Sequence, residues 1–217
     1  MERLVTVKGT GRYTAKPDII LLTMNLWSEN LRYKKAASDA AEQLERLRGA
    51  LVLQGFKKEE LKTTGFSVDS RYENKREPDG SFKSVFAGYR VSHGLKLEFD
   101  LDTALLSKTL EAIASSAGEP ELNIVFGIKD KEKAKASLLE NAVKNARERA
   151  EILVKASGEK LGQLMSIDYN WGELSFVSRT NYKMEQRCLV EASSGSMDIE
   201  PDDIDVSDNV TLVWELA

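Results

Sequence analysis

Apolar and polar residues alternate strictly in the stretch around residue 90, which is the pattern of a half-buried β-strand. A shorter alternation begins at Phe66 and Val68, ahead of a polar stretch that contains Pro78-Asp79-Gly80, a strong turn signal. We therefore predict a long antiparallel hairpin whose tip extends into solvent. One side of its second strand carries Tyr89, Val91, His93, Leu95, Leu97 and Phe99.

Three stretches have helical spacing of their apolar residues, at about 32–54, 103–115 and 131–157. Gly55 and Gly158 stand where left-handed C-terminal caps are expected, and Asn30 is predicted to cap the start of the first helix. In the third helix the residues that recur every four positions let it lie close to a sheet because most of them are small. They are Ala134, Leu138, Ala142, Ala146 and Ala150.

The beginning of the chain predicts a short strand, a turn at Gly9-Thr10-Gly11, a stop at Pro17 and a second strand from Ile19 to Trp27. A dinucleotide-binding loop is excluded there, because that motif must open a helix and a strand follows instead. Further strands are predicted near 122–128, 163–169 and 206–214, with an irregular region between the last two.

These elements predict an α+β fold, in which helices pack on one side of a single mixed, mainly antiparallel sheet with long hairpins. No linker rich in Gly, Pro and Ser divides the 217 residues. We therefore expect one domain over 1–217, with two subdomains at about 1–100 and 101–217.

The charge balance argues against nucleic acid as a partner. Lys and Arg number 31 against 35 Asp and Glu, the signs are interleaved, and the net charge is −4. The most apolar run, from Ile19 to Leu22, is too short to span a membrane. The first residues carry no leader pattern. The sequence as written thus predicts a cytoplasmic protein, and a periplasmic or cell-envelope protein if a signal peptide has been removed.

Candidate catalytic, cofactor-binding and metal-binding residues are not predicted, because the reactive side chains do not form a recognisable set. His93 is the only histidine and is interpreted as a packed or interfacial residue, with a pH-sensitive contact as the alternative. Cys188 is the only cysteine, which excludes an intramolecular disulfide. We interpret it as a buried thiol, and a redox-sensing thiol is the alternative.

Two further groups of residues have structural interpretations. An acidic cluster lacks the glycine and the offsets of a calcium loop, so a solvated loop is expected. It comprises Asp198, Glu200, Asp202, Asp203, Asp205 and Asp208. A set of aromatic residues favours core or subunit contacts over a ligand groove. It comprises Trp27, Trp171, Trp214, Tyr169 and Tyr182.

Motifs in the same order along most of the chain resemble the SIMPL-domain family, whose bacterial members include periplasmic and outer-membrane immunogenic proteins. The opening V-x-G-x-G segment and Pro17-Asp18 are followed by Thr63 to Phe66 and by Gly88-Tyr89-Arg90. The alanine-stepped helix from Ala134 to Ala156 and a closing strand complete the resemblance. That strand contains Pro201, Ile204, Val210, Leu212 and Trp214.

The resemblance implies an α+β scaffold that assembles into symmetric homo-oligomers, with links to oxidative-stress tolerance and no catalytic residues to carry over. Our first hypothesis is a non-enzymatic, self-assembling scaffold or interaction protein with a protein partner, since exposed strand edges recruit further chains. The alternative is a small-molecule binding module with its pocket between the alanine-rich helix and the sheet. An enzyme that uses carboxylate pairs such as Glu59-Glu60 or Asp202-Asp203 is the third.

Overall fold

The computed structural model describes residues 3–78, 80–116, 120–170, 172–184 and 199–217. The chain forms two compact units that interleave along the sequence. Unit 1 comprises 1–18, 127–179 and 201–217, and unit 2 comprises 19–126 and 180–200. The single-domain expectation for 1–217 stays a prediction.

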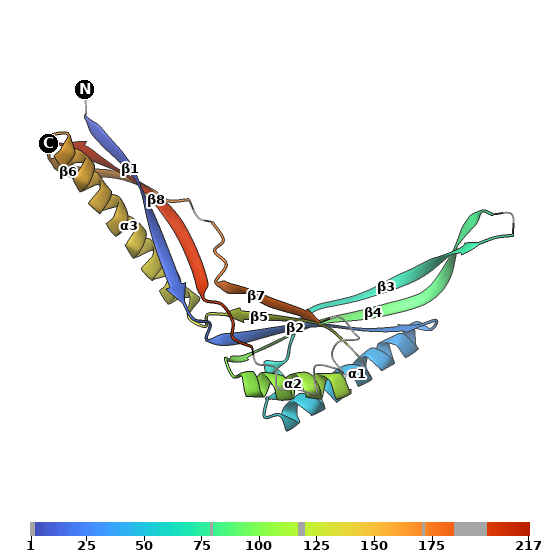
Figure 1. Cartoon of the computed structure of the whole chain (residues 1–217). Coiled ribbons are helices and arrows are strands. Elements are labelled where there is room, and N and C mark those ends of the chain that lie inside the picture. The colour runs from blue at the N-terminus through green and yellow to red at the C-terminus, as the bar shows by residue number, and fades with distance from the viewer. Residues whose placement is uncertain (1–2, 79, 117–119, 171, 185–198) are drawn as a thin grey trace. The chain divides into compact units, whose positions relative to one another are not determined.

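Unit 2 is built on an antiparallel sheet whose strand order is β3-β4-β2-β5-β7 (Figure 1). The strands are β2 (Ile19–Asn30), β3 (Lys62–Arg76), β4 (Phe82–Asp100), β5 (Glu121–Gly127) and β7 (Val177–Met184). Two helices, α1 (Tyr33–Leu53) and α2 (Thr103–Ser116), lie against the same face of this sheet. A short 3₁₀ turn, Lys58–Glu60, leads from α1 into β3.

The core of unit 2 lies between this helical layer and the sheet. Leu47 and Leu51 of α1 and Leu106 and Ile113 of α2 are buried there. They meet the apolar face of the sheet, which is supplied by Ile20, Leu22, Met24, Leu26, Leu95, Leu97, Leu122, Ile124 and Phe126. Leu95 and Leu97 belong to the alternating set around residue 90, so that strand pattern is confirmed.

The predicted hairpin is confirmed as β3 paired with β4, from Lys62 opposite Lys96 to Arg76 opposite Phe82. The C-terminal cap of α1 is also confirmed. Gly55 has φ +100°, and the Phe56 N–H donates to the Leu51 carbonyl, which completes a Schellman motif. The N-cap prediction was wrong. Arg32 occupies that position, and the Asn30 side chain instead accepts from the Arg32 N–H.

Unit 1 holds a second antiparallel sheet, whose strand order is β1-β8-β6. Its strands are β1 (Leu4–Ala15), β8 (Ile204–Leu216) and β6 (Leu161–Asp168). The long helix α3 (Lys131–Ala156) packs on it through the predicted alanine stripe, and Ala142, Ala146 and Ala150 are completely buried. α3 begins at Asp130, whose side chain accepts from the Lys133 N–H, and ends before Gly158 at φ +81°.

The glycines of the opening motif do not form the predicted turn. Gly9 and Gly11 lie inside β1, opposite Val210 and Asp208 of β8. A Cβ atom on Gly9 would lie 2.1 Å from the Ala142 carbonyl oxygen, and one on Gly11 would lie 2.0 Å from that of Leu138. The two glycines are there because the α3 backbone passes directly over them, and this requirement comes from a helix about 130 residues later in the chain.

Two other expectations need correction. The α+β class and the antiparallel hairpins are confirmed, but the strands form two sheets instead of the single sheet that was expected. The region expected to be irregular contains β7, which extends the sheet of unit 2 beside β5. β7 follows residues 172–176, which adopt no regular structure.

Replacing Gly9 with Ala should destabilise the protein by about 2–3 kcal/mol, because the added methyl group overlaps the backbone of α3. Gly49→Ala is the matched control. A Cβ at Gly49 meets nothing within 4 Å, and alanine in an exposed helix should add about 0.5–1 kcal/mol of stability. Chemical denaturation followed by circular dichroism measures both changes. Equal effects of the two substitutions would contradict the close contact of β1 with α3.

Candidate functional site

The clearest candidate site is the part of the hairpin that continues where β2 stops. β2 ends at Asn30, opposite Tyr89 of β4. Beyond that point, in the part of the chain that the structure describes, β4 pairs only with β3, so a two-stranded ribbon projects from the sheet (Figure 1). We call this ribbon, residues 71–76 and 82–88, the arm. A β-bulge at Arg71/Tyr72 marks its beginning.

A charged cluster ties the base of the arm to the sheet. Glu29 at the end of β2 accepts hydrogen bonds from Arg90 of β4 and Arg71 of β3, so it links three strands. Burial would raise the pKa of Glu29, but the hydrogen bonds and charges of Arg90 and Arg71 outweigh it and hold the pKa below its usual value. The Arg90 guanidinium also lies 5.0 Å from the centre of the Trp27 ring. Glu29 is therefore ionised and paired at neutral pH.

A chain of aromatic rings runs from α1 along one face of the arm. Tyr33 of α1 contacts Tyr89, Tyr89 contacts Phe86, and Phe86 contacts Tyr72, with ring centres 5.9, 5.2 and 5.7 Å apart. All three contacts have edge-to-face geometry, which is favourable for aromatic pairs. The rings in the arm are nevertheless exposed to water. The exposed fractions are 60% for Tyr72, 40% for Phe86 and 71% for Phe82 near the tip.

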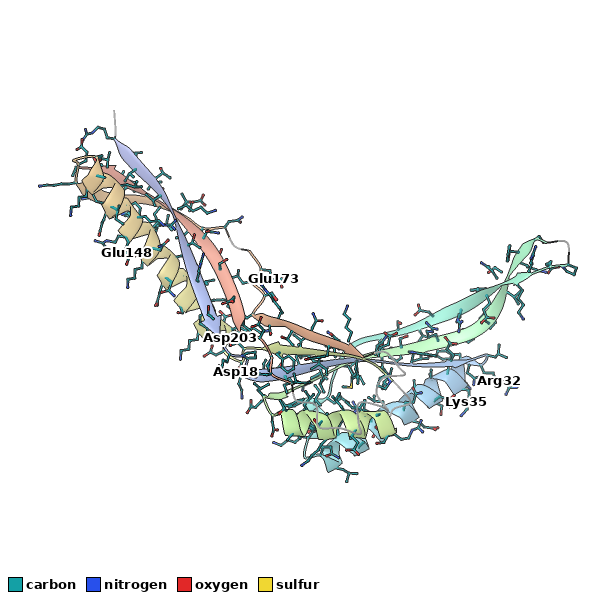
Figure 2. The ribbon with its side chains drawn as sticks, viewed as in Figure 1. Asp18, Arg32, Lys35, Glu148, Glu173 and Asp203 are labelled. Atoms are coloured by element: carbon teal, nitrogen blue, oxygen red, sulfur yellow. The ribbon has the colours of Figure 1, made fainter. Side chains whose placement is uncertain are left out.

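The helical layer reaches Tyr89, which packs against the α1 alanines, and leaves Tyr72, Phe82 and Phe86 uncovered. Figure 2 shows Arg32 and Lys35 at the N-terminal end of α1, close to where the arm begins. Val91 lies two residues from Tyr89 towards the body of the sheet, and it is buried against Ala36 and Ala40 of α1. The aromatic chain thus lies on the same face of the strands that α1 and α2 cover in the body of unit 2. In the arm this face extends past the end of α1.

His93 lies on β4 in the body of the sheet, on the side that faces α1. Its ring centre is 4.7 Å from that of Phe66, its cross-strand neighbour, and the side chain is half-buried. Burial lowers the pKa of the imidazole, and the positive charge of Arg48 on α1 lowers it further. The neutral ring is therefore the resident form at pH 7.

A cleft of about 440 Å³ lies between the polar side of α1 and the end of β2. Its side chains include Trp27, Glu29, Asp39, Gln43 and Arg46. Charges of both signs are mixed there. Ser28 is the single serine of its lining, which contains no histidine and no cysteine. The Ser28 hydroxyl donates to the Ala36 carbonyl, so it acts as a structural contact between β2 and α1.

The alanine-rich helix leaves little room for the pocket expected between it and the sheet. The alanines of α3 are buried in contact with β1, and the cleft of about 480 Å³ at its flank is polar. Three side chains of α3 line that flank and bind the backbone of β1. The Thr10 N–H donates to Asn145 Oδ1 (3.0 Å), while Asn141 Nδ2 and Arg149 Nη1 donate to the Arg12 and Lys8 carbonyls (3.3 and 3.1 Å).

The acidic cluster has structural partners in unit 1. Asp208 accepts from the Tyr169 hydroxyl at 2.8 Å, and Asp205 accepts from the Thr14 hydroxyl at 2.6 Å. Among the described residues, no group of three or more His, Cys, Asp or Glu side chains is placed to hold a metal ion. Asp198, Trp171 and Cys188 lie outside the described residues, so the interpretations given to them stay predictions.

The other described aromatic residues singled out from the sequence lie in separate places, except that Tyr169 packs against the cluster that contains Trp214. Trp214 is buried under α3 in unit 1, whereas Trp27 and Tyr182 are partly exposed in unit 2. The aromatic chain of the arm was missed as a site. A signal for it was present, because Tyr72, Phe82 and Phe86 flank a turn at a point where the strands become otherwise polar.

The fold and the arm define an α+β protein that exposes aromatic side chains on a two-stranded ribbon. The chain belongs to the SIMPL family, described as proteins of unknown function (DUF541), whose model matches residues 5–214. The family resemblance is therefore confirmed. A related protein is the 26 kDa periplasmic immunogenic protein of Brucella melitensis, which is 25% identical over 166 residues. The match covers 75% of this chain and 65% of that protein's length.

Within the described residues, no helix combines the length and the apolar character needed to cross a bilayer.

The single histidine provides a direct test of the packing of β4 beside Phe66 and α1 in the body of the sheet. We expect His93 to titrate with a midpoint below 6.5 in an NMR experiment, because burial and Arg48 disfavour its charged form. Phe66→Ala should move the midpoint back towards 6.5. The unfolded chain binds the proton more readily, so stability is present above pH 6.5 and falls as the pH drops towards the folded pKa. A midpoint at or above 6.5 would contradict this packing.

Proposed function

We propose that this chain is a non-catalytic protein that associates with further copies of itself and uses the arm as its contact surface. The observation that carries the proposal is the chain of exposed aromatic rings on a ribbon of two strands. The proposal includes a periplasmic location, which rests on the name of the Brucella relative. A link to oxidative-stress tolerance stays a prediction from the family resemblance.

The physics of the arm supports burial by a partner. An isolated two-stranded ribbon is only marginally stable in water, because it has no third strand and no second layer. Its aromatic contacts supply some cohesion, yet Tyr72 and Phe82 keep most of their surface in water. Contiguous exposed apolar surface of this kind is typical of interaction sites.

The exposed aromatic surface is large enough for a contact between two copies. At about 200 Å² per ring, the exposed parts of Tyr72, Phe82 and Phe86 in the arm and of Tyr33 and Phe66 outside it amount to about 560 Å² of surface. A contact that covered these rings in both copies would bury about 1,100 Å², which is near the lower bound for a specific interface. Backbone pairing along the strand edges would add to this area.

The test compares the full chain with a double substitution in the arm, Tyr72→Ser with Phe86→Ser. We expect the unaltered chain to form oligomers in sedimentation velocity and light scattering. The double substitution should weaken association at least about tenfold, because truncating central aromatic residues removes much of the binding free energy.

The control is Leu53→Ser, which removes a large exposed apolar side chain at the end of α1, away from the arm. It should leave association unchanged, and circular dichroism checks that all variants are folded. A chain that sediments as a monomer at every concentration would remove the proposal. Equal loss in the control and in the arm variant would show that another surface holds the copies together.

A further inference from the structure

We propose that two copies join through the outer edges of their β3 strands, antiparallel and with a two-fold axis at Tyr72. This inference rests on the proposed self-association and specifies its geometry. The result is a continuous four-stranded ribbon, β4-β3-β3-β4, in which each Tyr72 lies opposite the Tyr72 of the second copy. A two-fold contact of this kind is self-complementary, because each strand offers the same edge to the other.

A comparison of the sheet edges favours β3. The outer edge of β1 is occupied by side chains from α3 at Lys8, Thr10 and Arg12. β6 and β7 have eight residues each, and β6 has two register shifts against β8. β3 has fifteen residues and ends the sheet of unit 2. Long, regular and open edges are the ones that pair with another chain.

β3 is regular over the part that would pair. Its register shifts against β4 fall at Thr63/Gly65 and at Arg71/Tyr72. At the second shift β3 advances by one residue while β4 advances by two, so the extra residue, Ala87, belongs to β4. From Gly65 to Arg76 the side chains of β3 therefore alternate between the two faces without interruption.

The charged side chains on one face of β3 favour this register of the two β3 strands. Asp69, Arg71, Glu73 and Lys75 share this face, and their signs alternate from negative to positive. Antiparallel pairing about Tyr72 sets Asp69 opposite Lys75 and Arg71 opposite Glu73, and the two-fold axis generates each pair twice. All four cross-strand pairs then join opposite charges, which stabilises neighbouring strands.

The registers with their axis at Ser70, Arg71 or Glu73 lack this complementarity, and an axis at Asn74 has it only by using Glu77, which lies beyond the end of β3. A shift of the axis by one residue, to Arg71 or Glu73, sets that residue against itself and joins like charges next to it. An axis at Ser70 keeps only the two Asp69–Arg71 pairs. Arg71 already binds Glu29 and lies 3.4 Å from Glu73 of its own strand, but a guanidinium has enough donors for a further carboxylate.

The opposite face of the strand supports the same register. Tyr72 lies there together with Val68, which packs with the buried Val91 and the α1 alanines. With the axis at Tyr72, the two tyrosines meet at the centre, and each is backed by its own Phe86. The exposed aromatic chains of the two copies thus become one continuous apolar strip.

The decisive experiment is disulfide trapping in the full chain carrying Cys188→Ser, with one further cysteine per variant. In the proposed register Ser70 lies opposite Asn74 of the second copy, with Cα atoms about 5 Å apart, which a disulfide can bridge. Ser70 of one copy and Ser70 of the other are offset by four residues, or about 14 Å. Both positions are exposed and polar, so cysteine there leaves the aromatic chain intact.

A mixture of Ser70→Cys and Asn74→Cys chains should form a covalent heterodimer under mild oxidation, whereas each variant alone should stay uncrosslinked. Crosslinking of either variant alone, or none in a mixture that sediments as an oligomer, would overturn the register and leave self-association standing. A monomer in sedimentation removes the proposed function itself. A monomer that instead binds lipid vesicles through the arm would overturn both.

A charge exchange provides the second test. Asp69→Lys alone and Lys75→Asp alone each set like charges opposite one another twice, and each should weaken association about tenfold. The two substitutions in one chain restore opposite charges, and the dissociation constant should return to within about twofold of the original. Asp69→Lys also meets Arg90 within its own chain, and the double variant keeps that contact, so recovery cannot come from folding. A double variant no better than the single ones would refute the pairing.

Discussion

The end of β2 at Asn30 is the constraint on which the arrangement of unit 2 depends. Up to that point β4 has a strand on either side, and its apolar face is covered by α1. Beyond it β3 continues the same alternation of side chains, β4 resumes it after the bulge at Ala87, and neither strand has that cover. Tyr72 and Phe86 therefore lie on the extension of a core face, in contact with each other and, through Phe86, with Tyr89, and they keep 60% and 40% of their surface exposed.

Two edge strands of this chain show opposite solutions to the same physical problem. An edge strand presents backbone amides and carbonyls that seek partners. On β1 these groups are satisfied by Asn141, Asn145 and Arg149, which recur every four residues on one side of α3. β3 instead carries charges of alternating sign along its exposed length. In the proposed pairing, such a pattern repels a strand in the wrong register and accepts one in the right register.

Local sequence patterns predicted most of the features that depend on near neighbours, and the N-cap of α1 is the exception. The β3–β4 hairpin, the Schellman cap at Gly55 and the alanine face of α3 were predicted, because each depends on neighbours within a few residues. Gly9 and Gly11 were assigned to a turn because local preference favours glycine there, whereas the structure uses them for the passage of α3. The aromatic chain of the arm was overlooked, since its members are separated in sequence and become neighbours only through the pairing of β3 with β4.

The sequence by itself determined the three helices and most of the strands, where α1 and α3 end and which face of each element is apolar, but it missed β7 and the strand position of Gly9 and Gly11. Those properties arise from side-chain periodicity and from local backbone preferences. Only the tertiary structure decided that the strands divide into two sheets, that β2 stops before its neighbours, and that one apolar face continues past its cover. These outcomes depend on which distant segments pair, and pairing is set by the combined packing of the whole chain.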